Sequence, residues 1–214
     1  MPKIQILDEH TINQIAAGEV IERPASVVKE LVENSLDAGA KNIWIRIEEG
    51  GTSLIVVRDD GKGMDRIDAE NAFKKHATSK IRIFDDLQTV NTSGFRGEAL
   101  PSIASISRLR MSTCAKGQDI GTQVTIEGEN DLLIEELATP LGTKIEVADL
   151  FFNTPVRSKY LKRISTELQH IVKIVTVEAI RRPDVSFTLN HGERKIIDAP
   201  ESDLKTRIGV LLGN

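Results

Sequence analysis

Two carboxylates and a carboxamide lie on one side of a helix that is predicted over residues 25–38 and that ends at Gly39. At about 100° per residue, Glu30, Asn34 and Asp37 fall within about 60° of one another. The apolar residues fall in a broad arc on the opposite side: Val28, Leu31, Val32 and Leu36. Such a polar ridge is either a solvated helix face or a site where a carboxylate positions water and an amide oxygen binds Mg²⁺. Features further along the chain favour the second interpretation.

A second candidate site follows an apolar strand predicted over residues 54–59. Asp59 ends this strand, and Gly61 and Gly63 just beyond it permit close approach of the backbone to a ligand. A carboxylate in that position can accept a hydrogen bond from the exocyclic amine of adenine and leaves little room for guanine. The alternative is an ordinary turn after a strand.

A third candidate is the run Gly94-Phe95-Arg96-Gly97-Glu98-Ala99-Leu100, in which two glycines precede a predicted helix. Backbone N–H groups at a helix start can converge on phosphate oxygens. Upstream, Thr78, Ser79 and Lys80 offer hydroxyls and a positive charge within residues 75–93, a long polar stretch that we expect to act as a lid. Each pattern also occurs by chance, so only their combination is informative.

Together these residues suit phosphoryl transfer to water. Glu30 is the candidate base, Asn34 the candidate Mg²⁺ ligand and Asp59 the residue that binds the adenine, while the glycine loop holds the phosphates. The sequence contains neither a Walker loop nor a Gly-x-Gly-x-x-Gly after its first strand, so nucleotide binding must use another design.

Composition restricts the other possibilities. The 214 residues are 40% hydrophobic and 28% charged with a net charge of −4, which is ordinary for a globular protein and gives no global basic field. The lone Cys114 cannot form an internal disulfide, and the four histidines lack zinc-ligand spacing. No secretion signal and no apolar run of roughly 20 residues is present, so we expect a cytoplasmic protein without a membrane span.

Strands and helices alternate without strict βαβ order, which favours an α+β two-layer sandwich with a mixed, largely antiparallel sheet. Strands are predicted over residues 42–48, 54–59, 108–114, 122–128, 132–137, 143–150, 185–190 and 194–198. Helices are predicted over residues 11–17, 25–38, 65–74, 98–106 and 158–180, and from about residue 201. The inward face of the long helix is predicted to comprise Leu161, Ile164, Leu168, Ile171, Val172 and Val175.

A basic cluster precedes and opens this long helix: Arg157, Lys159, Lys162 and Arg163. It is either a solvated face or a site for DNA phosphates.

The order and spacing of these motifs resemble the N-terminal ATPase domain of bacterial MutL DNA mismatch repair proteins. The segments that carry the resemblance are residues 14–24, 30–39, 59–63, 76–81, 94–100, 142–143 and 149–157. DNA gyrase B subunits, heat-shock chaperones and sensor histidine kinases share the Glu/Asn helix and the Asp-Gly-x-Gly turn but generally lack the other signatures. Asp60 and Met64 depart from the pattern, since many members have Asn and Ile there.

The resemblance implies the Bergerat ATP-binding fold of the GHKL superfamily, with ATP and Mg²⁺ as cofactors. It makes Glu30 the general base and Asn34 the Mg²⁺ ligand. The residues it implies for ATP binding are Asn34, Asp59, Gly61, Gly63, Thr78, Ser79, Lys80, Gly94, Phe95, Arg96, Gly97, Glu98 and Thr143.

The resemblance also implies a partner set. ATP would close the lid and dimerise the domain, and the closed dimer would relay mismatch detection by a MutS-type protein to downstream nuclease and helicase factors. DNA would bind without sequence preference, and the protein would associate with the nucleoid during repair. We expect an N-terminal arm and short helix over residues 1–24, the ATPase domain over 25–200 and a connection to a second subdomain over 201–214. Because the family's second subdomain supplies a lysine to the γ-phosphate, we expect this chain to hydrolyse ATP weakly.

Two alternatives stay open. The chain could be a nucleotide-gated binding module whose output is dimerisation and partner contact. It could also be the ATPase domain of a type II topoisomerase, which residues 94–100 disfavour.

Overall fold

A computed structural model describes residues 21–74, 77, 97–128 and 130–213. Its strands are β1 Asn42–Glu48, β2 Leu54–Asp59, β3 Arg108–Cys114, β4 Gly121–Glu127, β5 Leu133–Leu137, β6 Gly142–Ala148, β7 Ser186–His191 and β8 Arg194–Ala199. Its helices are α2 Pro24–Asp37, α3 Arg66–Asn71, α4 Ala99–Ser105, α5 Pro155–Ser158, α6 Ile164–Arg181 and α7 Leu204–Leu212, with a 3₁₀ turn η1 at Glu49–Gly51. The predicted helix over residues 11–17 and nearly all of the predicted lid lie outside the described residues.

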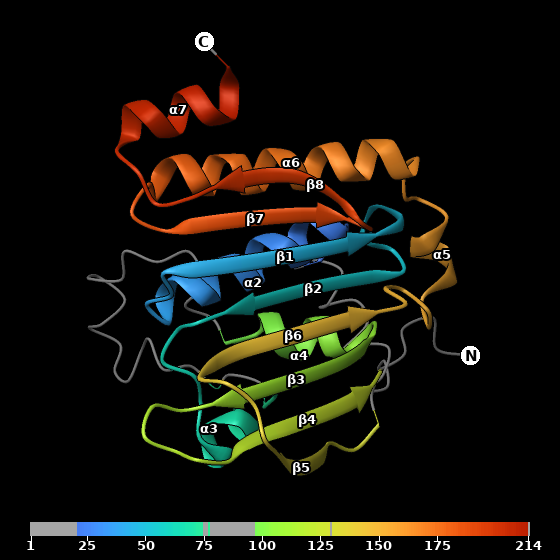
Figure 1. Cartoon of the computed structure of the whole chain (residues 1–214). Coiled ribbons are helices and arrows are strands. Elements are labelled where there is room, and N and C mark those ends of the chain that lie inside the picture. The colour runs from blue at the N-terminus through green and yellow to red at the C-terminus, as the bar shows by residue number, and fades with distance from the viewer. Residues whose placement is uncertain (1–20, 75–76, 78–96, 129, 214) are drawn as a thin grey trace, which may run out of the picture.

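The described strands form one eight-stranded sheet in the order β5-β4-β3-β6-β2-β1-β7-β8 (Figure 1). Only β1 and β7 pair in parallel among them, and the other neighbours are antiparallel. Helix α6 lies between β6 and β7 in the chain, and this connection brings β7 into its parallel position beside β1. The predicted α+β fold with a mixed, largely antiparallel sheet is confirmed.

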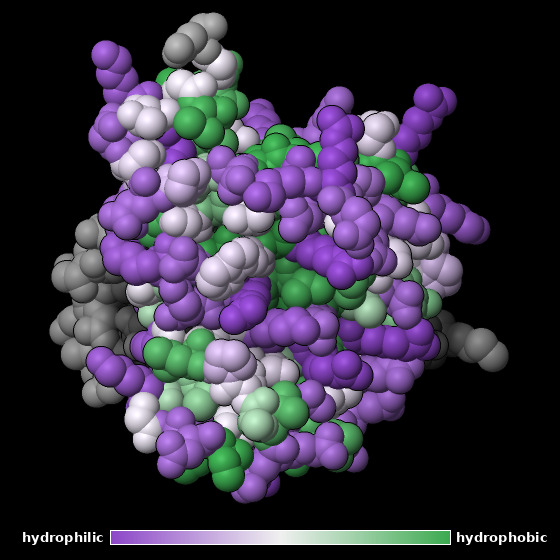
Figure 2. Space-filling model, viewed as in Figure 1, coloured by the Kyte–Doolittle hydropathy of each residue, from purple (hydrophilic) through white to green (hydrophobic). Residues whose placement is uncertain are grey.

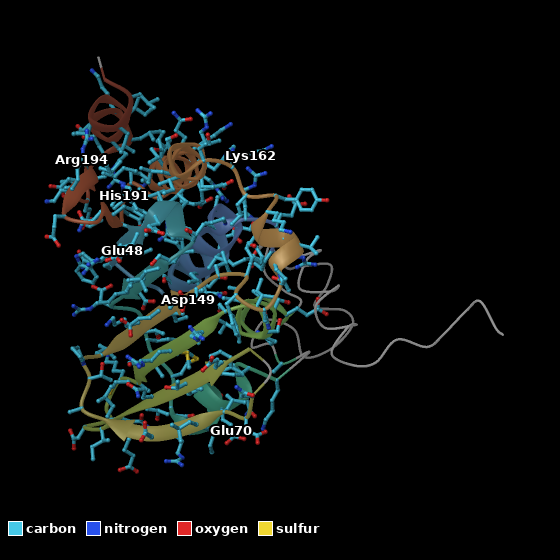
Figure 3. The ribbon with its side chains drawn as sticks, turned by 90° about the vertical axis from the view of Figure 1, so that its right-hand side faces the viewer. Glu48, Glu70, Asp149, Lys162, His191 and Arg194 are labelled. Carbon is cyan, nitrogen blue, oxygen red and sulfur yellow. The ribbon has the colours of Figure 1, made fainter. Side chains whose placement is uncertain are left out.

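Helices cover one face of this sheet, and the other face is open to solvent (Figures 1 and 3). In β1 the residues alternate, with Ile43, Ile45 and Ile47 buried under the helices. Trp44 on the open face is 39% exposed, and the Arg58 guanidinium lies over its ring at 5.0 Å. Hydrophilic side chains spread over this face, with apolar ones between them (Figure 2).

Helix α2 packs its apolar side on the centre of the sheet, as its pattern predicts. Its fully buried residues include Val28, Leu31 and Val32, while Leu36 is only partly buried. The predicted bounds of β1, β2 and β3 are confirmed, and α2 begins one residue before the predicted start. Strand β6 ends at Ala148 rather than Leu150, because Asp149 has a φ of 50°, which extended backbone excludes.

The predicted start of the long helix at Ser158 is wrong. Pro155 opens the separate short helix α5, and α6 begins only at Ile164, after Arg163 in extended conformation. The backbone N–H of Lys162 donates to Glu167 Oε1 at 2.9 Å, which holds the linker against the first turn of α6. Ile164 is therefore 49% exposed instead of inward, and Glu167 takes a buried position.

Two further helix bounds differ from prediction. Helix α3 is shorter than predicted and ends at Asn71, while α7 begins at Leu204, directly after its N-cap residue Asp203. The buried Arg207 of α7 donates hydrogen bonds to the carbonyls of Ala179, Pro183, Val185 and Pro200. Within the described ranges, no helix has the length and apolar character needed to cross a bilayer.

Candidate nucleotide-binding site

The end of β2 meets the C-terminal half of α2 through two buried polar side chains. The hydroxyl of Ser35 donates to Asp59 Oδ2 at 2.8 Å, and the two residues are only 2% and 6% exposed. Sequence reasoning missed Ser35, although a lone serine within the apolar arc of a helix is the signal of a buried hydrogen bond. This contact ties the C-terminal half of α2 to the end of β2, and Asn34 precedes Ser35 in the same helix.

Asp59 accepts two hydrogen bonds from the chain. Besides the bond from Ser35, the backbone N–H of Gly61 donates to Oδ1 at 2.9 Å. A carboxylate has about four acceptor positions, so acceptor positions are left for a ligand. Burial raises the pKa of Asp59 more than these hydrogen bonds lower it. An ionised carboxylate is therefore costly here, which is typical of a group kept for binding.

The turn after Asp59 is held close to its neighbours by glycine. Gly63 has a φ of +64°, and a Cβ there would lie 1.9 Å from the carbonyl oxygen of Cys114. A Cβ at Gly61 would lie 2.8 Å from the Cβ of Ala38. The backbone N–H of Lys62 donates to the carbonyl oxygen of Ala38 at 3.0 Å. The turn thus lies between the end of α2 and the end of β3, and no side chain fits at Gly63.

Asp60 joins this turn to the start of β1. Its carboxylate accepts from the backbone N–H groups of Lys41 and Asn42, both at 2.8 Å, and from Asn42 Nδ2 at 2.7 Å. Burial alone would raise the pKa of Asp60, but these bonds outweigh it and lower the pKa. A carboxylate, which only accepts, suits three donors, so the departure from the family's Asn is chemically consistent.

A row of three side chains crosses the sheet on its helix-covered face. Thr143 faces Asp59 across β2 and β6, and Thr113 faces Thr143 across β6 and β3. The two threonine Oγ1 atoms are 3.0 Å apart. Thr113 is completely buried, Thr143 is half-buried, and sequence reasoning missed Thr113. Its signal was weak, because threonine is common in strands.

The polar ridge of α2 is present as predicted. Glu30 and Asn34 are half-buried and lie one helical turn apart, whereas Asp37 is exposed. Among the described residues no group of three His, Cys, Asp or Glu side chains is placed to hold a metal ion. Mg²⁺ is usually held by one or two protein oxygens together with substrate phosphates and water, and the single carboxamide of Asn34 fits that mode.

The glycine loop is described only at its end. Gly97 has a φ of +65°, and a Cβ there would lie 2.4 Å from the carbonyl oxygen of Ala77. Glu98 then precedes α4. The other predicted contacts lie outside the described residues: Thr78, Ser79, Lys80, Gly94, Phe95 and Arg96.

The basic cluster is not part of this site. Arg157 lies in α5 and Lys159, Lys162 and Arg163 lie in the linker before α6, so the cluster precedes the long helix (Figure 3). These residues follow the C-terminal end of β6, whereas Thr143 lies at its start. The two regions therefore lie toward opposite ends of β6, which has 7 residues.

Comparisons with known proteins show the family of this chain. The family described as "Histidine kinase-, DNA gyrase B-, and HSP90-like ATPase" matches residues 21–147. The curated DNA mismatch repair protein MutL of Koribacter versatilis is 52% identical over the whole chain, and that of Clostridium botulinum is 53% identical over 92% of it. The chain spans about a third of the length of these relatives, namely 33% and 29%.

Solved structures give the same result. The Aquifex aeolicus MutL ATPase domain complexed with ADP superposes with a TM-score of 0.73 at 34% identity, covering 90% of this chain and 70% of that one. The N-terminal domain of a DNA repair protein superposes with a TM-score of 0.77 at 28% identity, covering 94% of this chain and 60% of that one. The chain therefore belongs to the histidine kinase-, DNA gyrase B- and HSP90-like ATPases, and within them to the ATPase domains of MutL DNA mismatch repair proteins.

Proposed function

We propose that this chain binds Mg-ATP with the adenine against Asp59 and hydrolyses it with Glu30 as the base. The observation that carries the proposal is the buried Asp59 carboxylate, which has two donors from the chain and acceptor positions left for a ligand. The exocyclic amine of adenine supplies a further donor. The ADP named in the Aquifex aeolicus structure supports a nucleotide in the corresponding fold.

The adenine is bound at the end of β2. Gly61 and Gly63 let the turn after Asp59 pack closely on Ala38 and Cys114, and Thr143 lies next to Asp59 in the adjacent strand. The phosphates extend toward the start of α4, where Gly97 and Glu98 lie. We include the remaining predicted contacts in this proposal: Thr78, Ser79, Lys80, Gly94, Phe95 and Arg96.

The chemistry takes place along the polar ridge of α2. Glu30 positions a water molecule for in-line attack on the γ-phosphate and accepts its proton. The carboxamide oxygen of Asn34 would hold Mg²⁺, which would supply positive charge to offset that of the phosphates. Their separation of one helical turn allows one residue to reach the water and the other the metal.

Steady-state hydrolysis and equilibrium ATP binding test these roles. Glu30→Ala should lower kcat by about 100-fold or more while ATP still binds. Asn34→Ala should weaken the binding of Mg-ATP itself. Asp37→Asn is the matched control, because Asp37 lies on the same ridge but is exposed. Unchanged turnover in Glu30→Ala would exclude Glu30 as the base, and unchanged Mg-ATP affinity in Asn34→Ala would exclude Asn34 as the metal ligand.

We further propose that ATP closes a lid and dimerises this domain, and that the dimer links a MutS-type protein to downstream nuclease and helicase factors in the cytoplasm. Residues 1–24 would form an arm, 25–200 the ATPase domain and 201–214 the connection to a second subdomain. The names of the MutL relatives support this role. The oligomeric mass with a non-hydrolysable ATP analogue, against ADP and no nucleotide, tests dimerisation. A dimer without measurable turnover would instead favour a nucleotide-gated binding module.

Binding of DNA without sequence preference is proposed for the basic cluster. Residues 150–166 contain four cations and no acidic residue, which suits phosphate contacts. The double variant Lys162→Glu with Arg163→Glu should weaken binding to duplex DNA and reduce its salt dependence, whereas Lys195→Glu on β8 should not. Binding that did not weaken with added salt would contradict phosphate contacts.

A further inference from the structure

Thr113 is a buried polar residue with no part in the function proposed above. Its Oγ1 contacts three groups: the backbone N–H of Met64 at 2.9 Å, the carbonyl oxygen of Gly142 at 3.1 Å and Thr143 Oγ1 at 3.0 Å. These groups belong to the turn after Asp59 and to the start of β6. Thr113 therefore joins the elements that surround the adenine end of the site.

The number of protons and lone pairs determines the direction of these bonds. A hydroxyl has one proton and two lone pairs. The Met64 N–H can only donate and the Gly142 carbonyl can only accept, so Thr113 uses one lone pair on Met64 and its proton on Gly142. Only a lone pair is left for Thr143. All three contacts are satisfied together when the hydroxyl of Thr143 donates to Thr113.

Thr143 then keeps its own lone pairs for the half-buried side that faces the site. It stands beside Asp59 in the adjacent strand, so among the described residues these two side chains are neighbouring acceptors, and neither donates a hydroxyl proton to a ligand. Adenine presents an amine there, which donates, whereas guanine presents a carbonyl oxygen, which accepts. Two acceptors favour the amine and repel the carbonyl.

We propose that Thr113 is a specificity-determining residue that acts through Thr143. By accepting the proton of Thr143, it holds Thr143 as a second acceptor beside Asp59 and so favours adenine over guanine nucleotides. This inference rests on the proposed binding of adenine at Asp59.

The test measures binding of ATP, GTP and purine riboside triphosphate, an ATP analogue without the amine, to the parent chain and its variants. Thr113→Val removes the hydroxyl at nearly constant shape, and Thr113→Ser restores it. We expect Thr113→Val to reduce the preference for ATP over GTP by about tenfold, the effect of losing one net hydrogen bond. Loss of the contacts with Met64 and Gly142 weakens the binding of all three nucleotides by a common factor, and affinity for the analogue should fall by this factor alone. Thr113→Ser should recover the preference.

The possible outcomes separate specificity from a structural role. Equal losses for all three nucleotides would show that Thr113 only supports the fold and would overturn the proposal, as would an unchanged preference. If Thr113→Val does not fold, Thr143→Val decides, because the proposal requires that variant to lose the same preference. A parent chain that binds no ATP would instead overturn the proposed function.

Discussion

Replacing Ser35 by alanine tests whether Asp59 is held ionised by its hydrogen bonds. The change removes a 2.8 Å bond to a buried carboxylate and leaves the bond from Gly61. A hydrogen bond to a charged group contributes about 1.5–3 kcal/mol. We expect a loss of that size in the free energy of unfolding at neutral pH, and weaker ATP binding.

The effect should depend on pH in a defined direction. The Ser35 bond lowers the pKa of folded Asp59, so its removal raises that pKa further above the ordinary value of 3.8. The bond stabilises the ionised form, so its contribution is present above the pKa of Asp59 and shrinks as pH falls through it. The difference in stability between parent and variant should therefore be largest at neutral pH and decrease toward acid.

Urea unfolding across a pH series measures this difference, with the linear extrapolation applied at each pH. Ser26→Ala is the control, since Ser26 lies on the same helix more than two turns from Ser35. The Ser35 hydroxyl also lies 3.1 Å from the carbonyl oxygen of Leu31. A Ser35→Ala loss that is the same at every pH would refute the argument, because it would mean that the hydroxyl contributes packing or a bond to Leu31 and not a bond to the carboxylate. A loss no larger than that of Ser26→Ala would refute it as well.

Three other predictions concern single residues. Gly63→Ala should destabilise the fold by more than about 1 kcal/mol and abolish ATP binding, measured by urea unfolding and calorimetry, because its φ is +64° and no Cβ fits there. Arg207→Met should cost about 3 kcal/mol or more, since it leaves four carbonyls without their donor, whereas Arg194→Met on the exposed edge should change little in the same measurement. Asp60→Ala should raise the KM for ATP more than it lowers kcat, because it removes the bonds that hold the turn after Asp59 to Asn42. Equal effects on KM and kcat would contradict a role of Asp60 in positioning this turn.

Prediction from the sequence succeeded where local pattern and structure agree. The alternation of β1 and the apolar run of β2 predicted both strands with their observed bounds. The prediction failed at the start of α6, where apolar residues at helical spacing continue upstream through Leu161. Pro155 opens a separate helix there, and the bond from Lys162 to Glu167 ends the linker, a contact that periodicity does not report.

The site divides in the same way. Residue types and spacing alone made Glu30, Asn34, Asp59 and the glycines after it candidates for the site, because a helix ridge and a strand end are local features. Which residues hold Asp59 depends on chain segments far apart in sequence: Ser35 is 24 residues away and Thr143 belongs to another strand. Strand order and register place Thr113, Thr143 and Asp59 in one row. Buried polar groups must find hydrogen-bond partners. Because this row is buried, its carboxylate and two hydroxyls take the fixed hydrogen-bonding roles on which the proposed preference for adenine over guanine depends.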